Sequence, residues 1–123
     1  MAFTESPHPG CFLLSEGPGA LSRAAVTVDV PAATTLQAGT VLGRLSGTGH
    51  YAPYDEKNSD GTETAEAILI DPLENTDDAP AALAGVVIDC LAEVRAASLV
   101  WGAGVDVDGG LTDLAAKFIK ARE

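Results

Sequence analysis

The sequence predicts a mainly β domain, a small α+β fold in which one C-terminal amphipathic helix follows a compact β-rich body. Residues 23–31 alternate apolar and polar side chains, which is the period of a half-buried strand. Thirteen glycines and seven prolines favour short strands joined by turns. Residues 111–119 instead repeat apolar side chains at helical spacing. At 123 residues the chain can form one domain with one modest core.

Residues 1–20 differ in composition from the rest of the chain. Prolines and glycines recur from Pro7 to Gly19, so a regular element is not expected there, and the only apolar cluster is residues 11–14. Two interpretations stay open: a mobile arm used in binding, or a terminus whose apolar cluster folds onto its own core. We therefore expect a flexible N-terminal arm over residues 1–20 and one domain over residues 21–123.

The first strand is expected over residues 23–31. Val26, Val28 and Val30 share one face, and polar side chains occupy the other. Pro31 ends this strand because it has no N–H to donate to a neighbouring strand.

Residues 38–70 are expected to form the centre of the fold. An apolar run at 40–42 lies between two glycines, and a second run at 65–70 has the length of a strand. Between them, glycines favour a sharp bend, Pro53 favours an extended segment, and residues 58–61 form a strong turn signal. The predicted order is strand, bend, extended tyrosine segment, turn, strand.

The last third of the chain is expected to hold one strand and the helix. Residues 71–80 are acidic and predict a loop, residues 84–94 contain a β-branched run that favours a strand, and residues 96–100 predict a turn or short helical segment. A glycine and aspartate loop should then span residues 102–110. The helix is expected to be capped by Thr112 or Asp113 and to leave only residues 121–123 beyond it, so any later strand would be very short.

The net charge of −11 bears on the partners of this protein. Residues 51–80 contain nine acids and one base, Lys57. Such a surface repels phosphate backbones, so we expect no nucleic-acid binding. No basic segment precedes a long apolar stretch and no apolar run reaches membrane-spanning length, which predicts a soluble protein with no membrane partner. Cys11 and Cys90 lie far apart in the sequence and are expected to be free thiols in a reducing cytoplasm.

Motifs for catalysis or metal binding fail on inspection. The aspartates at 106, 108 and 113 do not fit a calcium loop, because the sixth position counted from Asp106 is Leu111 rather than glycine. His8 and His50 are the only histidines, and no nucleophile elbow or phosphate-binding loop accompanies them. We expect no enzyme activity, no cofactor and no metal.

Three aromatic residues are candidates for either the core or a subunit interface. They are Tyr51 and Tyr54, which bracket Pro53, and Trp101, which ends an apolar segment. Large aromatic side chains with a polar group are common in both settings.

Several motifs occur in order along the chain. They are Ala-Gly-Thr-Val-Leu-Gly at 38–43, Gly-x-Tyr-x-Pro-Tyr-Asp at 49–55, Asp-Gly-x-x-x-Ala-x-Ala-Ile-Leu at 60–69, Leu-Ser-Arg with Val-Thr-Val at 21–28, and Glu-Val with Leu-Val-Trp at 93–101. Together they resemble the head decoration proteins of lambda-like tailed bacteriophages, over roughly residues 21–120.

The resemblance implies a β-clip-type fold and a structural function in the virion. Members of this family form trimers on the outside of the expanded capsid at local threefold positions, where they clamp the major capsid protein against the pressure of packaged DNA. Their N-terminal segment adds a strand to the capsid protein's sheet. By this resemblance Phe12, Leu13 and Leu14 would anchor a capsid-binding arm, and the protein would occupy the outer capsid surface after assembly in the host cytoplasm.

Two other function classes stay open at this point. One is a non-viral β-clip or barrel module that binds a small ligand in a pocket of convergent polar groups. The other is a small hydrolase, which would need His50 beside a nucleophile.

Overall fold

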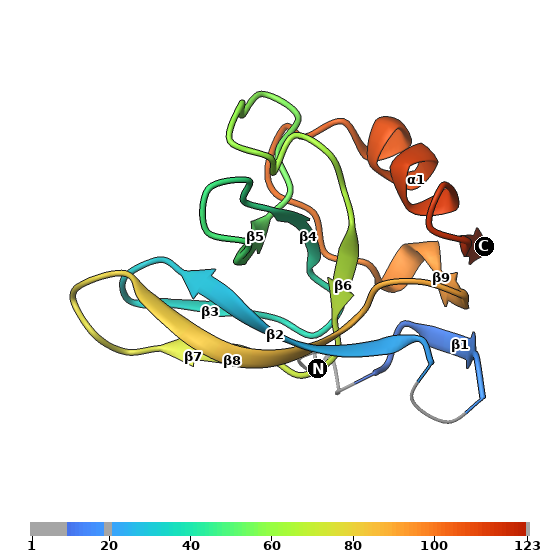
Figure 1. The fold of residues 1–123 in the computed structure, drawn as a ribbon, viewed down its shortest axis with the longest axis horizontal. Helices are drawn as coiled ribbons and strands as arrows, with labels where there is room; N and C mark the ends of the chain where they lie inside the picture. The colour runs from blue at the N-terminus through green and yellow to red at the C-terminus, as the bar shows by residue number, and fades with distance from the viewer. Residues whose placement is uncertain (1–9, 19–20, 123) are drawn as a thin grey trace, which may run out of the picture.

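Short strands separated by tight turns make up most of the chain, as its glycine and proline content predicts. The computed structural model describes residues 10–18 and 21–122. Figure 1 follows its elements in order: β1 (Leu13–Glu16), β2 (Arg23–Val30), β3 (Thr34–Leu36), β4 (Val41–Arg44), β5 (Tyr51–Pro53), β6 (Ala67–Leu69), β7 (Leu73–Asn75), β8 (Ala81–Ile88), β9 (Ala92–Arg95), a 3₁₀ turn (Ala96–Ser98), α1 (Val107–Ala115) and β10 (Ile119–Arg122). The prediction of a mainly β domain with a single C-terminal helix is confirmed.

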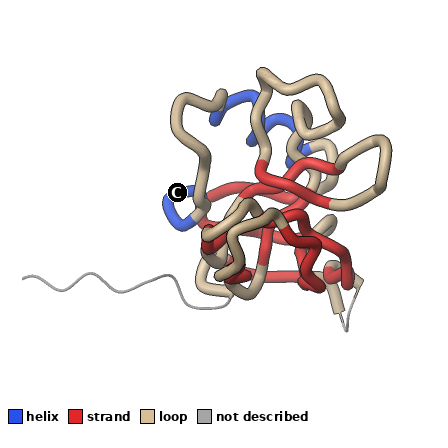
Figure 2. The backbone as a smooth tube through the Cα atoms, turned by 90° about the vertical axis from the view of Figure 1, so that its left-hand side faces the viewer, coloured by secondary structure: helices blue, strands red, loops and turns tan. Residues whose placement is uncertain are grey.

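A closed five-stranded barrel forms the body of the molecule. Its order is β2-β5-β4-β6-β8, and β2 and β8 pair antiparallel along their whole length, from Arg23 opposite Ile88 to Val30 opposite Ala81. Only one residue pair, Val28 opposite Tyr51, joins β2 to β5 and closes the barrel. Figure 2 shows the strands gathered into one body with the helical segments at its periphery.

The predicted strand at 23–31 is confirmed as β2, and the predicted centre at 38–70 is confirmed as β4, β5 and β6. β4 passes so close to the following turn that a side chain at Gly43 would lie 2.5 Å from the Cα atom of Thr62. Glycine is therefore required where the chain crosses itself.

Two small sheets extend the barrel. β3 pairs with β7 beneath the far ends of β2 and β8, and β1, β9 and β10 form a three-stranded sheet in the order β1-β9-β10 (Figure 1). The expectation that residues 71–80 are only a loop is wrong, because β7 lies within them. Asn75 holds the loop beyond β7, where its amide donates to the carbonyls of Val30, Pro31 and Ala79.

The barrel strands separate two apolar cores. Neighbouring residues point to opposite faces of a strand, so Val41 and Ile68 join one core while Leu42 and Leu69 join the other. The first core lies under α1 and the β1-β9-β10 sheet and contains Phe12, Leu114 and Ile119. The second contains Val28, Val30 and Val87. Strands that are buried on both faces explain the continuous apolar runs in the sequence.

The C-terminal helix is displaced from its predicted position. Asp106 caps it, with its carboxylate accepting a hydrogen bond from the N–H of Gly109, so residues 107–110 are helix rather than loop. The helix ends at Ala115, and Phe118 adopts φ +60°. Ile119 then begins β10, which runs parallel to β9. The expectation that the helix continues through residue 119 with almost no strand after it is wrong.

The predicted strand at residues 84–94 is two strands. β8 ends at Ile88, a turn at residues 89–91 includes Leu91 at φ +49°, and β9 begins at Ala92. The predicted short helical segment at 96–100 is confirmed as the 3₁₀ turn.

Candidate interaction surfaces

The apolar cluster near the N-terminus divides between the core and the surface. Phe12 is fully buried in the first core, Leu13 packs partly against it, and Leu14 is exposed. Residues 13–16 form β1, which pairs with β9. Phe12 and Leu13 thus pack on the subunit's own core, and a part for the cluster in capsid binding stays a prediction. Residues 1–9, 19 and 20 of the expected arm lie outside the described residues.

The three candidate aromatic residues differ in exposure. Tyr54 is only 3% exposed, and its ring meets that of Trp101 edge to face at 5.8 Å between centroids. The Tyr54 hydroxyl donates to the carbonyl of Asp106 at 3.0 Å, which ties this pair to the start of α1. Tyr54 is therefore a core residue. Tyr51 and Trp101 are half-buried, and their place in a subunit interface stays a prediction.

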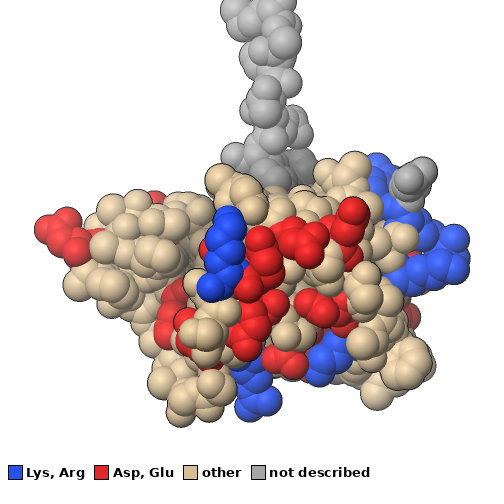
Figure 3. All heavy atoms as spheres, turned by 90° about the horizontal axis from the view of Figure 1, so that it is seen from above, with Lys and Arg blue, Asp and Glu red and all other residues tan. Residues whose placement is uncertain are grey.

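Acidic side chains gather over the loop between β5 and β6 and over the start of α1 (Figure 3). We call this the acidic surface and define it by Asp55, Glu56, Asp60, Glu63, Asp106 and Asp108. Two hydrogen bonds from Thr62 hold the pKa of Asp60 below its usual range, so this carboxylate is ionised at neutral pH. One exposed base, Lys57, lies among these acids and donates to the carbonyl of Gly104 at 3.1 Å, so the surface has six acids and one base. Val107 is exposed between Asp106 and Asp108.

A second surface lies at the end of the molecule built by the β1-β9-β10 sheet. Backbone hydrogen bonds join the turn before β9 to the turn before β10, from Leu91 to Lys117 and from Ala92 to Phe118. We call this surface the end face. It consists of four exposed apolar residues, Leu14, Leu21, Leu91 and Phe118, and five exposed bases, Arg23, Arg95, Lys117, Lys120 and Arg122.

Three of the five bases of the end face form ion pairs within the subunit. Lys117 lies 3.7 Å from a carboxylate oxygen of Glu66, and the other two pairs join β1, β2, β9 and β10. Arg122 donates to Glu93 at 2.6 and 2.9 Å, and Ser15 donates to the other oxygen of the same carboxylate, so one glutamate connects β1, β9 and β10. Arg23 donates to Glu16 at 2.9 Å. These arginines hold the pKa values of Glu93 and Glu16 below their usual range.

The sequence did not predict the end face. Phe118 fits the apolar spacing of the predicted helix, but its side chain is 73% exposed because the helix ends before it. One feature of the sequence could have indicated this surface. Three of the seven bases of a strongly acidic chain, Lys117, Lys120 and Arg122, lie within six residues.

His50 does not complete a catalytic site among the residues that the structure describes. The Nδ1 atom of His50 lies 2.8 Å from an Asp29 carboxylate oxygen, at the edge of a groove of about 770 Å³ between β2, β8 and the β4–β5 loop. No serine or cysteine side chain hydrogen-bonds the His50 ring in the part of the chain that the structure describes. His8 lies outside the described residues.

The side chains that could bind a metal ion are dispersed over the described residues. Over residues 10–18 and 21–122, no group of three or more acidic, histidine or cysteine side chains could hold a metal ion. Cys11 and Cys90 are both free thiols. Within the same residues, no helix has the length and apolar character needed to cross a membrane.

Comparison with known proteins identifies the family. A search of curated proteins finds no match. The model of the family described as "Bacteriophage lambda head decoration protein D" matches residues 2–117, which is nearly the whole chain. The chain therefore belongs to the family of phage head decoration proteins.

Proposed function

We propose that this chain is a structural protein that binds the outside of the expanded phage capsid as a homotrimer and stabilises it against the pressure of packaged DNA. The family match over residues 2–117 carries this proposal. Its partners are then the major capsid protein and two further copies of itself, placed at local threefold positions. Assembly takes place in the host cytoplasm, and the finished protein is part of the virion.

The composition and the fold support a function in binding rather than catalysis. The net charge of −11 suits a protein that stays outside the DNA-filled shell. A subunit of this size with two small cores gains stability from association. The family match is to a phage head decoration protein, and it therefore argues against a non-viral small-ligand module and against a hydrolase.

We place the capsid-binding segment before the first strand. The resemblance assigns residues 1–20 to an arm that adds a strand to the capsid protein, but Phe12 and β1 pack within the subunit. The proposed arm is therefore shortened to residues 1–9. Main-chain hydrogen bonds to an exposed strand would supply its affinity.

Co-sedimentation with expanded, undecorated heads tests both parts of this proposal. The full chain should sediment with the heads and raise the temperature at which they release DNA. A chain that begins at Gly10 should keep its unfolding temperature and lose most of its binding. If the full chain stays in the supernatant, the proposed function is wrong. If the shortened chain binds at full strength, only the assignment of the arm is wrong.

A further inference from the structure

Exposed apolar side chains and charges are unevenly distributed over this molecule. The described residues have five large exposed apolar side chains: Leu14, Leu21, Leu91, Val107 and Phe118. Four belong to the end face, and the fifth, Val107, lies in the acidic surface. Five of the seven bases also belong to the end face. Residues with the character of an interface are thus confined to two surfaces.

Phe118 is at odds with its local surroundings in two ways. It follows the end of α1 with φ +60°, a conformation that suits glycine and is strained for a bulky aromatic residue. Its side chain is 73% exposed, so no burial within the subunit offsets that strain. Its ring borders a shallow groove of about 650 Å³ between α1 and β10, lined by Leu111, Ala115 and Ala121. Its backbone N–H and carbonyl are hydrogen-bonded to Ala115 and Ala92, so only the ring is left uncovered. An exposed aromatic ring at a strained position points to a contact between molecules.

The two surfaces are complementary in charge and in apolar character. On the end face, Lys117 and Lys120 flank Phe118. On the acidic surface, Asp106 and Asp108 flank Val107 at the start of α1. Two copies of a chain with net charge −11 repel each other in most orientations. Contact between these two surfaces is favoured, because it brings opposite charges together.

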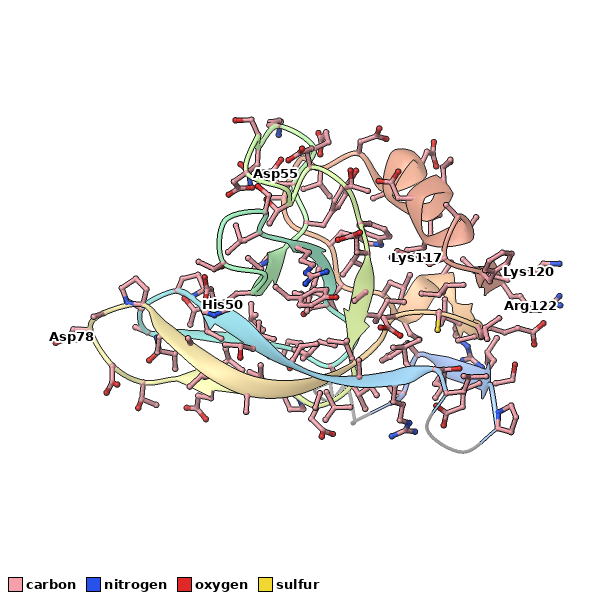
Figure 4. The ribbon with its side chains drawn as sticks, in the orientation of Figure 1. His50, Asp55, Asp78, Lys117, Lys120 and Arg122 are labelled. Atoms are coloured by element: carbon pink, nitrogen blue, oxygen red, sulfur yellow. The ribbon has the colours of Figure 1, made fainter. Side chains whose placement is uncertain are left out.

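The surfaces also lie in positions that allow a closed assembly. In Figure 4, Lys120 and Arg122 lie at one end of the molecule, and Asp55 lies on an adjacent side rather than at the opposite end. A contact between two different surfaces is head-to-tail, and its rotation from copy to copy decides between a ring and a filament. Surfaces on adjacent sides favour a small ring.

We infer that the end face of each copy docks on the acidic surface of the next, with Phe118 against Val107. This inference rests on the homotrimer of the proposed function and names its interface. The occupant of the end face is a second copy of this chain, since the acidic surface offers negative charge and one exposed apolar side chain, Val107, to the bases and apolar side chains of the end face.

Two substitutions and two matched controls test this interface by sedimentation velocity over a range of protein concentrations. Phe118→Gly relieves the positive φ and removes the aromatic ring, and Val107→Lys puts a cation in the acidic surface. Ala33→Gly is the control for backbone relief, because Ala33 has φ +51° near the start of β3, outside both surfaces. Thr35→Lys is the control for an added cation, at an exposed position of β3.

Both interface substitutions should weaken the trimer about tenfold or more, since burial of one large apolar side chain contributes that much affinity. Both controls should assemble as the unmodified chain does. The trimer of the unmodified chain should also weaken as salt is raised. Far-UV circular dichroism should show that all four variants keep their strands.

The possible results test the trimer and the proposed interface independently. If the unmodified chain is a monomer at every concentration and also on capsids, the homotrimer of the proposed function is wrong. If the unmodified chain is a trimer and either Phe118→Gly or Val107→Lys assembles normally, the trimer stands and this interface is wrong. Loss of capsid binding by Phe118→Gly with an intact trimer would assign the end face to the capsid and overturn the inference.

Discussion

At the scale of single residues, buried polar groups decide which loops are fixed. The Asn75 side chain is only 4% exposed and donates to three carbonyls at 3.0 to 3.1 Å. Its oxygen accepts from the N–H of Asp77 at 3.0 Å. One amide thus holds both ends of the loop between β7 and β8: its two N–H donors serve three carbonyls, and its oxygen accepts one hydrogen bond.

Replacement of Asn75 by aspartate should destabilise the protein. Asn75→Asp turns the donor group into an oxygen that faces three carbonyl oxygens, and such a buried unsatisfied group costs about 1–3 kcal/mol or more. Urea denaturation should show the loss as a lower midpoint. Gln37→Glu is the control for the same amide-to-acid change, since the Gln37 side chain is part-exposed and only its backbone carbonyl accepts hydrogen bonds; its effect should stay within about 0.5 kcal/mol. Equal effects of the two substitutions would contradict the assigned role of Asn75.

At the scale of elements, β1 depends on one anchor. Its pairing with β9 is irregular between Leu13 and Ser15, and Phe12, just before it, is fully buried in the first core. The strand should therefore be held mainly by the burial of this ring.

Phe12→Ala should cost about 3–5 kcal/mol of the free energy of unfolding, because it leaves a cavity in a packed core. Phe12→Leu keeps most of the volume and should cost less than about 1.5 kcal/mol. Denaturation at one fixed protein concentration compares the two. A small effect of Phe12→Ala would mean that β1 belongs to a detachable arm after all.

The three-stranded sheet should also depend on pH through Glu93. Arg122 lowers the pKa of this carboxylate from its ordinary value of 4.5, and Ser15 lowers it further. A lowered pKa in the folded state contributes stability that is present above pH 4.5 and is lost as the pH falls through the folded-state value.

Glu93→Gln should remove this contribution. The variant should be less stable than the unmodified chain at about pH 6, and the difference should shrink as the pH falls to about 3. Urea denaturation across that range measures it. A difference that stays constant or grows in acid would show that Glu93 does not stabilise the fold through its charge.

Elements with a local signal could be predicted from the sequence. β2 follows from the alternation of its valines, and β4 and β6 follow from apolar runs between turn residues. β10 could not be predicted in the same way. The spacing of Leu111, Leu114 and Phe118 continues a helix, and only pairing with β9 makes residues 119–122 a strand. β7 has three residues, and Asn75 in it has a low strand propensity.

At the scale of the whole molecule, the uneven distribution of charge arises from the fold. The sequence shows that acids exceed bases by eleven, but it cannot show that β10, with Lys120 and Arg122, lies beside β9, with Arg95. That arrangement depends on the order β1-β9-β10 and on the turns that precede β9 and β10. The candidate surfaces could therefore be found only once distant segments were placed side by side.

The central claim is that this chain decorates the outside of an expanded phage head as a trimer. A three-dimensional reconstruction of undecorated heads, before and after saturation with this protein, tests it most directly. We expect added density on the outer surface, at local threefold positions, with three copies of the barrel around each axis. Saturated heads without added density, or density from single copies away from these axes, would contradict the claim.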